Sequence, residues 1–390
     1  MIASSRHLEK SNPDVALALY PLNVEALLVE MVGQLNRQET DTSLEEMEAQ
    51  IRAAVPANAG DARIYSLLGE VLRRGEQVEA AYAMFDHALE LASTEIHALQ
   101  WSVYRAVADA DHDKAMEALD LMFRRWPERV GSFASAMPQV FSQENSYAAL
   151  LEMVAQSPPW RSRLIAELSS YNFENLDFTA QFLQDLASSS APPSAAETAT
   201  LLGSLFAHKR YDLAYRTFLF TLAEAEGDLA GFVFNGQFVQ NASGRRFDWM
   251  IRPQPGVSVT MPFISQDSSL PQGLFIEFGS TPVLRVGVEQ TIMLPAGSYE
   301  LEFTATATSA DLPKSLLWAI DCLDPGQPVQ RLEVPEGTYQ NRSFQTRFTI
   351  AQNCPVQSLS LRTNAMVESW SNRYGGKILF HQLRIMAVPS

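Results

Sequence analysis

The residues best suited to contact a ligand lie in a polar stretch near the end of the chain, Glu368 to Gly376. Trp370 and Tyr374 are four positions apart and could offer two ring faces to a sugar, because the apolar side of a pyranose ring stacks on aromatic side chains. Asn372 and Arg373 lie between them and could hydrogen-bond the hydroxyl groups at the sugar's edge. The competing interpretations are that this loop packs on its own domain or contacts a partner.

A second polar feature is Gln290, which interrupts a stripe of apolar residues that includes Val288 and Ile292. A buried glutamine either hydrogen-bonds nearby backbone groups or lines a groove in which a ligand binds. The candidate ligand-binding residues are therefore Trp370, Tyr374, Arg373, Asn372 and Gln290.

The chain has two cysteines, Cys322 and Cys354, and both lie in its C-terminal part. This distribution fits one disulfide formed in an oxidising compartment, and two buried free thiols are the alternative. We expect no metal site, since neither a histidine nor a second cysteine pair lies at ligand spacing from these sulfurs.

Catalytic motifs are missing from the sequence. It has neither a glycine-rich phosphate loop nor a Gly-x-Ser-x-Gly elbow. The triplet Asp111-His112-Asp113 contains residue types that are common in catalytic sites, but it would fill a turn between two helices. Glu277 is the one acid on a strongly apolar strand, and glycosidases need two facing carboxylates. We expect a protein without catalytic activity or cofactor.

The charge balance bears on the partner. The net charge is −16, and residues 1–225 carry 31 acidic and 17 basic residues, whereas residues 226–390 carry 14 and 12. Such an acidic chain lacks the basic footprint of a nucleic-acid binder. The second part has ten arginines and two lysines, a bias that would suit an anionic or sugar-like ligand or reflect overall codon composition.

The elements that must position these residues change in type near residue 228. Before it, apolar and small residues recur with a period of about 34 residues, which predicts stacked helix pairs. The unit at 62–95 and its weaker successor at 96–129 carry the pattern at Tyr65, Leu68, Gly69, Leu72, Ala81, Phe85 and Ala88, and at Leu99, Val103, Ala106, Ala115, Leu119 and Met122. Two capping boxes, Ser43 with Glu46 and Ser194 with Glu197, mark helix starts.

Beyond residue 228 the apolar residues alternate with polar ones. In Tyr299 to Ala307 the odd positions are apolar and the even ones polar, which indicates an antiparallel strand with one buried face. Short strands of this kind, beginning at Asn235 to Phe238, predict a β-sandwich. We expect further strands at 274–278, 284–294, 316–322, 344–350, 358–363 and 377–387.

Two motifs carry a family resemblance. The segment Asn235-Gly236-Gln237-Phe238 and the later run from Gln290 through Pro295-Ala296-Gly297-Ser298-Tyr299 are similar to jelly-roll carbohydrate-binding modules. The helical units resemble tetratricopeptide repeats. Nearly the whole chain resembles bacterial tetratricopeptide-repeat proteins with such a C-terminal domain, associated with the envelope or extracellular polysaccharide. Gln237 and Val239 stand where that family often has acidic residues.

The sequence thus predicts an all-α tetratricopeptide-like solenoid at 1–227 and an antiparallel β-sandwich with a jelly roll at 228–390. The resemblance implies an envelope protein, periplasmic or on the extracytoplasmic face, whose solenoid docks a protein partner while its jelly roll contacts a polysaccharide. The chain lacks 18 successive apolar residues, and its abrupt start suggests that a membrane anchor was removed. The alternatives are a pure protein scaffold with a structural β cap and an enzyme that modifies or hydrolyses polysaccharide.

Overall fold

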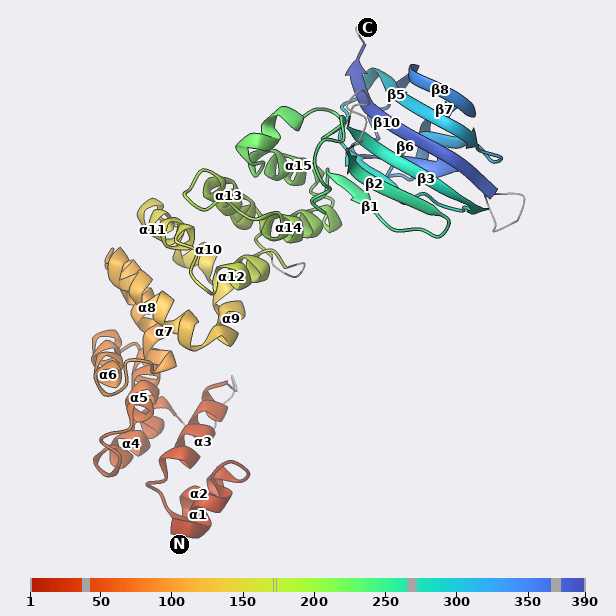
Figure 1. The fold of residues 1–390 in the computed structure, drawn as a ribbon. Helices are drawn as coiled ribbons and strands as arrows, with labels where there is room; N and C mark the ends of the chain where they lie inside the picture. The colour runs from red at the N-terminus through yellow and green to blue at the C-terminus, as the bar shows by residue number, and fades with distance from the viewer. Residues whose placement is uncertain are drawn as a thin grey trace. The chain divides into compact units, whose positions relative to one another are not determined.

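The computed structural model describes residues 2–36, 43–170, 172, 174–264, 272–365 and 373–388. Helices make up the N-terminal part and two antiparallel sheets the C-terminal part (Figure 1), as the sequence predicts. The chain divides into two compact units, Met1–Glu167 and Leu168–Ser390. The last helices therefore belong to the same compact unit as the strands, and the expected domain boundary at 227 and 228 stays a prediction.

The first unit consists of helices in pairs. They are α1 (Ile2–Leu8), α2 (Pro13–Leu19), α3 (Val24–Asn36), α4 (Leu44–Ala54), η1 (Val55–Ala57), α5 (Ala62–Arg74), α6 (Val78–Leu91), α7 (Ile96–Ala108), α8 (His112–Arg125), η2 (Pro127–Arg129), α9 (Val130–Ala134), α10 (Met137–Val140), α11 (Glu144–Ala155) and α12 (Arg161–Leu168). None of the helices in the described residues is long and apolar enough to span a membrane.

The repeat period of about 34 residues in the sequence equals the distance along the chain between the starts of equivalent helices. α5 and α7 start 34 residues apart, at Ala62 and Ile96. In the pair formed by α5 and α6, a Cβ atom on Gly69 would lie 2.6 Å from the ring of Phe85. Only glycine lets α5 and α6 approach this closely. Asp111 caps α8 by accepting a hydrogen bond from the Lys114 N–H (3.2 Å), so the Asp111-His112-Asp113 triplet begins a helix.

The second unit begins with helices, the last of which contact the sandwich. They are α13 (Leu176–Ala187), α14 (Ala195–Ala207), α15 (Tyr211–Phe220) and η3 (Glu224–Leu229). Phe218 of α15 meets the rings of Phe234 and Phe247 at 5.1 and 5.6 Å. The buried Arg245 forms an ion pair with Glu226 of η3. The helices are therefore joined to the sandwich by contacts between phenylalanine rings and by a buried ion pair.

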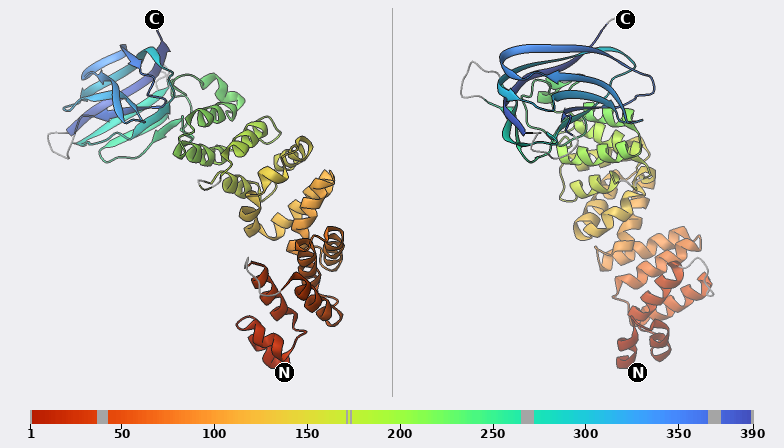
Figure 2. Two further views of the ribbon diagram at one scale, coloured as in Figure 1. Left: turned by 180° about the vertical axis from the view of Figure 1, so that it is seen from behind. Right: turned by 90° about the vertical axis from the view of Figure 1, so that its right-hand side faces the viewer.

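The strands form two five-stranded sheets within the described residues, in the orders β1-β4-β9-β6-β7 and β2-β3-β10-β5-β8. They lie face to face (Figure 2). Most successive strands cross from one sheet to the other, as in a jelly roll, while β2 pairs with β3 and β6 with β7 within one sheet. The strands are β1 (Trp249–Ile251), β2 (Val257–Phe263), β3 (Gly273–Pro282), β4 (Val288–Ile292), β5 (Gly297–Asp311), β6 (Leu316–Cys322), β7 (Gln327–Val334), β8 (Gly337–Ile350), β9 (Gln357–Thr363) and β10 (Arg373–Ala387).

The sandwich core lies between the two sheets. Trp249, Trp318 and Phe380 are fully buried there and form a chain of ring contacts at 5.8 and 5.3 Å. Cys322 and Cys354 form a disulfide with their Cα atoms 5.5 Å apart. The bond joins the end of β6 to the turn before β9, as the sequence predicts.

The structure corrects the expected first strand. Asn235 to Phe238 is a turn rather than a strand, with φ of 49° at Asn235 and 55° at Phe238. Positive φ values at two non-glycine residues are incompatible with extended backbone. The sequence analysis also missed β2, although its burial alternates from Val257 to Met261, and β7, whose burial does not alternate cleanly.

Candidate functional site

The polar stretch singled out in the sequence is only partly described. Trp370 and Asn372 lie outside the described residues, so their ligand role stays a prediction. Arg373 is exposed at the start of β10. The stretch therefore leads directly into a core strand.

Tyr374 does not fit the role we expected for it. Its ring is 0 % exposed and packs against Phe278 at 5.4 Å. Its hydroxyl donates a hydrogen bond to the Ser315 carbonyl (3.0 Å), and burial raises the pKa of Tyr374 to about 12. Since no ring face is open to a sugar, this residue holds β10 against the segment before β6.

Gln290 also serves the fold. It is 1 % exposed, its Nε2 donates to the Phe234 carbonyl (2.9 Å) and its Oε1 accepts from the Phe234 N–H (3.1 Å). Gln357 does the same for Leu294, whose N–H donates to the Gln357 Oε1 (2.8 Å). Both amides satisfy buried backbone groups of segments that form no sheet hydrogen bonds. Neither lines a groove.

A polar groove of the sandwich lies elsewhere, on the outer face of the sheet that contains β10. Its volume is about 550 Å³. It crosses β10, β5 and β8, strands that lie side by side in Figure 1. Its lining residues are Gln237, Val239, Gln272, Thr304, Asn341, Ser343, His381 and Gln382.

Two β-bulges shape the floor of this groove. The pairing of β10 with β5 skips His381 between Phe380 and Gln382, and the pairing of β5 with β8 shifts next to Asn341, which has φ of 43°. A bulge redirects the side chain of the extra residue. His381 and Asn341 therefore approach Thr306 from opposite sides: His381 Nε2 lies 2.8 Å from Thr306 Oγ1, and the Asn341 N–H donates to the same oxygen (3.0 Å).

His381 has a hydrogen-bonding capacity that the chain does not use. The side chain is 8 % exposed, and its Nδ1 has no partner among the described residues. Burial lowers the pKa of His381, so the ring is neutral at physiological pH. The unpaired nitrogen is itself buried, and the Nε2 atom is the one that bonds to Thr306.

The Asn-Gly-x-Phe motif builds the wall of the groove. The Asn235 side chain accepts from the Val239 N–H (2.9 Å) and donates to the Gln240 carbonyl (2.9 Å), which closes the turn. The Gly236 carbonyl accepts from the Leu383 N–H on β10 (2.7 Å), and a Cβ on Gly236 would overlap the Leu383 carbonyl. This close approach requires glycine. It holds Gln237 and Val239 beside His381.

The groove is polar but carries no charge among its described lining residues. Its functional groups are amides, hydroxyls and one imidazole, and Thr304 Oγ1 and Ser343 Oγ form a hydrogen bond of 2.9 Å. The arginines of the sandwich do not line this groove. Six of the ten form ion pairs, namely Arg245 with Glu226, Arg252 with Glu289, Arg331 and Arg362 with Asp321, Arg347 with Glu300, and Arg384 with Glu302. Ion pairing thus accounts for part of the arginine bias.

A stacked aromatic pair lies on the same face. The rings of Phe263 and Phe275 are 4.4 Å apart and half-buried. Phe275 pairs across to Leu379, which pairs to Thr306, the residue that contacts His381. The row of paired residues next to the groove, from Thr306 through Leu379 to Phe275, therefore ends at the stacked rings of Phe275 and Phe263.

Sequence reasoning missed His381 because it is a single histidine without a partner at ligand spacing. The available signal was the break in alternation at Phe380-His381-Gln382-Leu383, where two polar residues follow each other. Such a break indicates a bulge.

The other candidates for chemistry have structural partners. Glu277, the acid expected on an apolar strand, forms an ion pair with Lys377 (3.0 Å) on the sheet's outer face. In the part of the chain that the structure describes, His, Cys, Asp and Glu side chains do not gather into a group that could hold a metal ion.

The chain is distantly similar to solved proteins of two kinds. No protein-family model matches the sequence, and no curated protein matches it significantly. Solved tetratricopeptide proteins match the helical half and carbohydrate-binding modules match the β half.

A family 4 carbohydrate-binding module has 15 % identity and a TM-score of 0.31, covering 40 % of this chain and 99 % of its own. The module TmCBM61, solved with β-1,4-galactotriose, has 17 % identity and a TM-score of 0.27, covering 41 % and 99 %. PilF of Pseudomonas aeruginosa has 16 % identity and a TM-score of 0.30, covering 50 % and 87 %.

Proposed function

We propose that the protein is a non-enzymatic binding protein whose β-sandwich holds a neutral polysaccharide in the groove beside His381. The observation that carries this proposal is the uncharged polar lining, since amides, hydroxyls and a neutral imidazole match sugar hydroxyl groups and offer no positive charge to an anion. Four neighbouring strands from β3 to β8 span about 14 Å. This width suits an extended chain of sugars.

The test is binding by the full chain to neutral oligosaccharides such as cellohexaose, xylohexaose and a galactan, beside anionic alginate and polygalacturonate. Isothermal titration would compare wild type with His381→Ala and Gln382→Ala. We expect the affinity for the neutral ligand to fall about tenfold or more, as for a lost central contact. Thr349→Ala is the control, because Thr349 is exposed on the same sheet but outside the groove.

Preference for the anionic polymers would contradict a neutral ligand. If the chain binds no polysaccharide, or if His381→Ala leaves the affinity unchanged, the alternative of a structural β cap on a protein scaffold is favoured. The enzyme alternative is tested separately by incubating the chain with each polymer and analysing the products. We expect no change in chain length or composition.

The solenoid is proposed to dock an apolar segment of a protein partner. A groove of about 380 Å³ lies between α3, α5 and α7, with Leu28, Val32 and Leu67 among its apolar lining. Most of the charges around it form ion pairs within the chain: Glu70 pairs with Arg74, and Arg63 pairs with Glu25. Glu95 instead accepts hydrogen bonds from the Ser66 hydroxyl and the Ala98 N–H.

Co-purification from the native organism with identification of the bound protein tests this docking. Val32→Glu places a charge in the groove and should abolish capture of the partner. Val78→Glu is the matched control, because Val78 has a similar exposed fraction, 42 % against 38 %, and lies outside the groove. Equal loss with both variants would contradict docking at this groove.

We further propose that the protein acts in polysaccharide assembly or export at the periplasmic or extracytoplasmic face of the envelope. The support is the disulfide between Cys322 and Cys354, because disulfides persist in oxidising compartments. Alkylation of freshly lysed native cells should label neither cysteine before reduction and both after it. Labelling before reduction would place the chain in a reducing compartment.

A further inference from the structure

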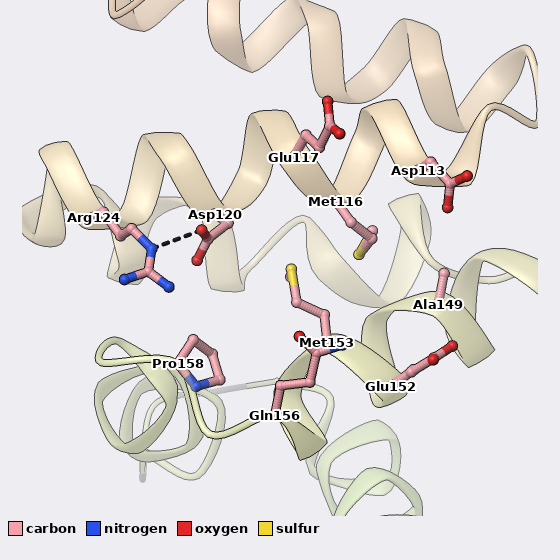
Figure 3. Close-up of a pocket in the computed structure, with 10 residues that line it drawn as sticks. All are labelled: Asp113, Met116, Glu117, Asp120, Arg124, Ala149, Glu152, Met153, Gln156 and Pro158. Carbon is pink, nitrogen blue, oxygen red and sulfur yellow. Dashed lines mark hydrogen bonds and ion pairs between the residues drawn. The ribbon is translucent and has the colours of Figure 1, made fainter.

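A second groove lies on the first compact unit, between α8 and α11 (Figure 3). Its volume is about 490 Å³. α8 contributes Asp113, Met116, Glu117, Asp120 and Arg124, and α11 and the turn after it contribute Ala149, Glu152, Met153, Gln156 and Pro158. It shares no lining residue with the groove between α3, α5 and α7.

The centre of this groove is formed by two methionines. Met116 and Met153 extend toward each other from the two helices (Figure 3), and both are half-exposed. Methionine is flexible and polarisable, so it adapts to apolar side chains of different shape. A pair of methionines at a groove's centre suits an inserted apolar side chain.

The rim of the groove is acidic. Asp120 is matched inside the chain, since it accepts hydrogen bonds from Arg124 Nε (2.6 Å) and Trp160 Nε1 (2.9 Å). Asp113, Glu117 and Glu152 are exposed and form no ion pair within the described residues. With Arg124 counted, the lining has a net charge of −3.

The charges are also unevenly placed. Asp113 and Glu152 lie toward one end of the groove, on opposite helices, while the Asp120–Arg124 pair lies toward the other (Figure 3). An occupant would therefore meet carboxylates from both walls at one end and an apolar surface at the centre.

We propose that this groove docks a basic segment of a partner protein, which inserts an apolar side chain between Met116 and Met153 and places a lysine or arginine near Asp113 and Glu152. The charge complementarity carries the proposal. Exposed ion pairs are individually weak, but several carboxylates of one sign steer a cationic partner to the site and fix its orientation. The inference is independent of the proposed polysaccharide groove.

The test uses the full chain and a synthetic amphipathic helical peptide of about 16 residues, with lysines on one face and leucines on the other. Fluorescence anisotropy gives its dissociation constant. In the variant Asp113→Asn with Glu117→Gln and Glu152→Gln, we expect the affinity to fall about tenfold. A peptide with glutamate in place of every lysine should not bind.

The matched control is Asp14→Asn with Glu45→Gln and Glu79→Gln. It removes the same charge from exposed carboxylates on other helices of the same unit, none of which lines either solenoid groove. We expect its affinity for the lysine peptide to stay within about twofold of wild type. An equal loss in the control would show diffuse attraction by the acidic surface and overturn the proposal.

A second measurement tests the apolar centre. With methyl-labelled methionine, the NMR signals of Met116 and Met153, assigned through Met116→Leu and Met153→Leu, should shift on addition of the lysine and leucine peptide. The same peptide with serine in place of leucine should bind more weakly. Unmoved methionine signals, or equal binding of the serine peptide, would overturn the docking of an apolar side chain here.

Discussion

At the residue scale, the buried polar side chains differ in how the chain uses their hydrogen-bonding atoms. Gln290 and Gln357 use both ends of their amides on the backbone. His381 uses one ring nitrogen on Thr306, and its other nitrogen lacks a partner in the described chain. Two buried polar residues can therefore differ in how completely the chain satisfies their hydrogen-bonding atoms.

Gln290→Ala is expected to destabilise the fold by about 2 to 4 kcal/mol, because it leaves a buried N–H and a buried carbonyl of Phe234 without partners. Urea unfolding measures this loss. Gln345→Ala, at an exposed position of β8, should change stability little. A Gln290→Ala protein of normal stability that has lost polysaccharide binding would return this residue to the ligand site.

The lowered pKa of His381 predicts a pH dependence of stability. The ordinary pKa is 6.5, and burial lowers it in the folded state. As the pH falls through 6.5, the unfolded chain takes up a proton that the folded chain does not, so stability is present above this pH and is lost between 6.5 and the lowered value. The melting temperature should therefore fall more in wild type than in His381→Gln between about pH 7.5 and 5.5. Parallel curves would contradict the buried neutral ring.

At the element scale, α15 and the segment 230–248 connect the helices to the sandwich. Phe218 meets Phe234 and Phe247, and Arg245 lies 5.3 Å over the Phe218 ring while pairing with Glu226. These contacts make the helices α13 to α15 part of the sandwich's compact unit. They explain why the boundary between the two compact units lies after Glu167 and not where the strands begin.

Phe218→Ala should destabilise this unit by about 3 kcal/mol or more, the usual cost of removing a buried phenylalanine. Hydrogen exchange followed by mass spectrometry should show faster exchange in α13 to α15 and in the sandwich together. Phe220→Ala is the control, because Phe220 is 62 % exposed on the same helix. Faster exchange in the helices alone would mean that the unit does not unfold cooperatively.

The disulfide is a second connection between separate elements. Cys322 ends β6, Cys354 lies in the turn before β9, and the two are 32 residues apart. Replacing both by alanine should lower the free energy of unfolding by roughly 3 to 4 kcal/mol in the chain-entropy model. Reductant should reproduce the loss in wild type and have no effect on the double variant. A smaller loss would show that the reduced chain retains structure in this loop.

At the scale of the whole molecule, two compact units with separate hydrophobic cores carry different candidate sites. The polar groove belongs to Leu168–Ser390, and the two solenoid grooves belong to Met1–Glu167. We expect two unfolding transitions in calorimetry. A saturating oligosaccharide should raise only the transition of the unit that contains the sandwich, and the lysine and leucine peptide only the other. A single transition shifted by both ligands would mean that the units unfold together.

The sequence by itself determined most of the helices and the longer strands. The repeat of 34 residues, the capping boxes at Ser43 and Ser194, and the alternation in Tyr299 to Ala307 all reappear in the structure. These signals are local, because helix and strand periods depend on neighbours a few residues away. The pairing of Cys322 with Cys354 followed from there being only two cysteines.

Only the tertiary structure decided which polar residues form a site. Gln237, Thr304, Asn341 and His381 come from distant parts of the chain and meet because β8, β5 and β10 pair in a register that two bulges shift. A one-residue shift turns a side chain to the other face of a sheet. Alternation could not show this, and it placed Tyr374 in a loop when the strand β10 buries it. The register of distant strands, which local periodicity does not encode, therefore set the candidate site.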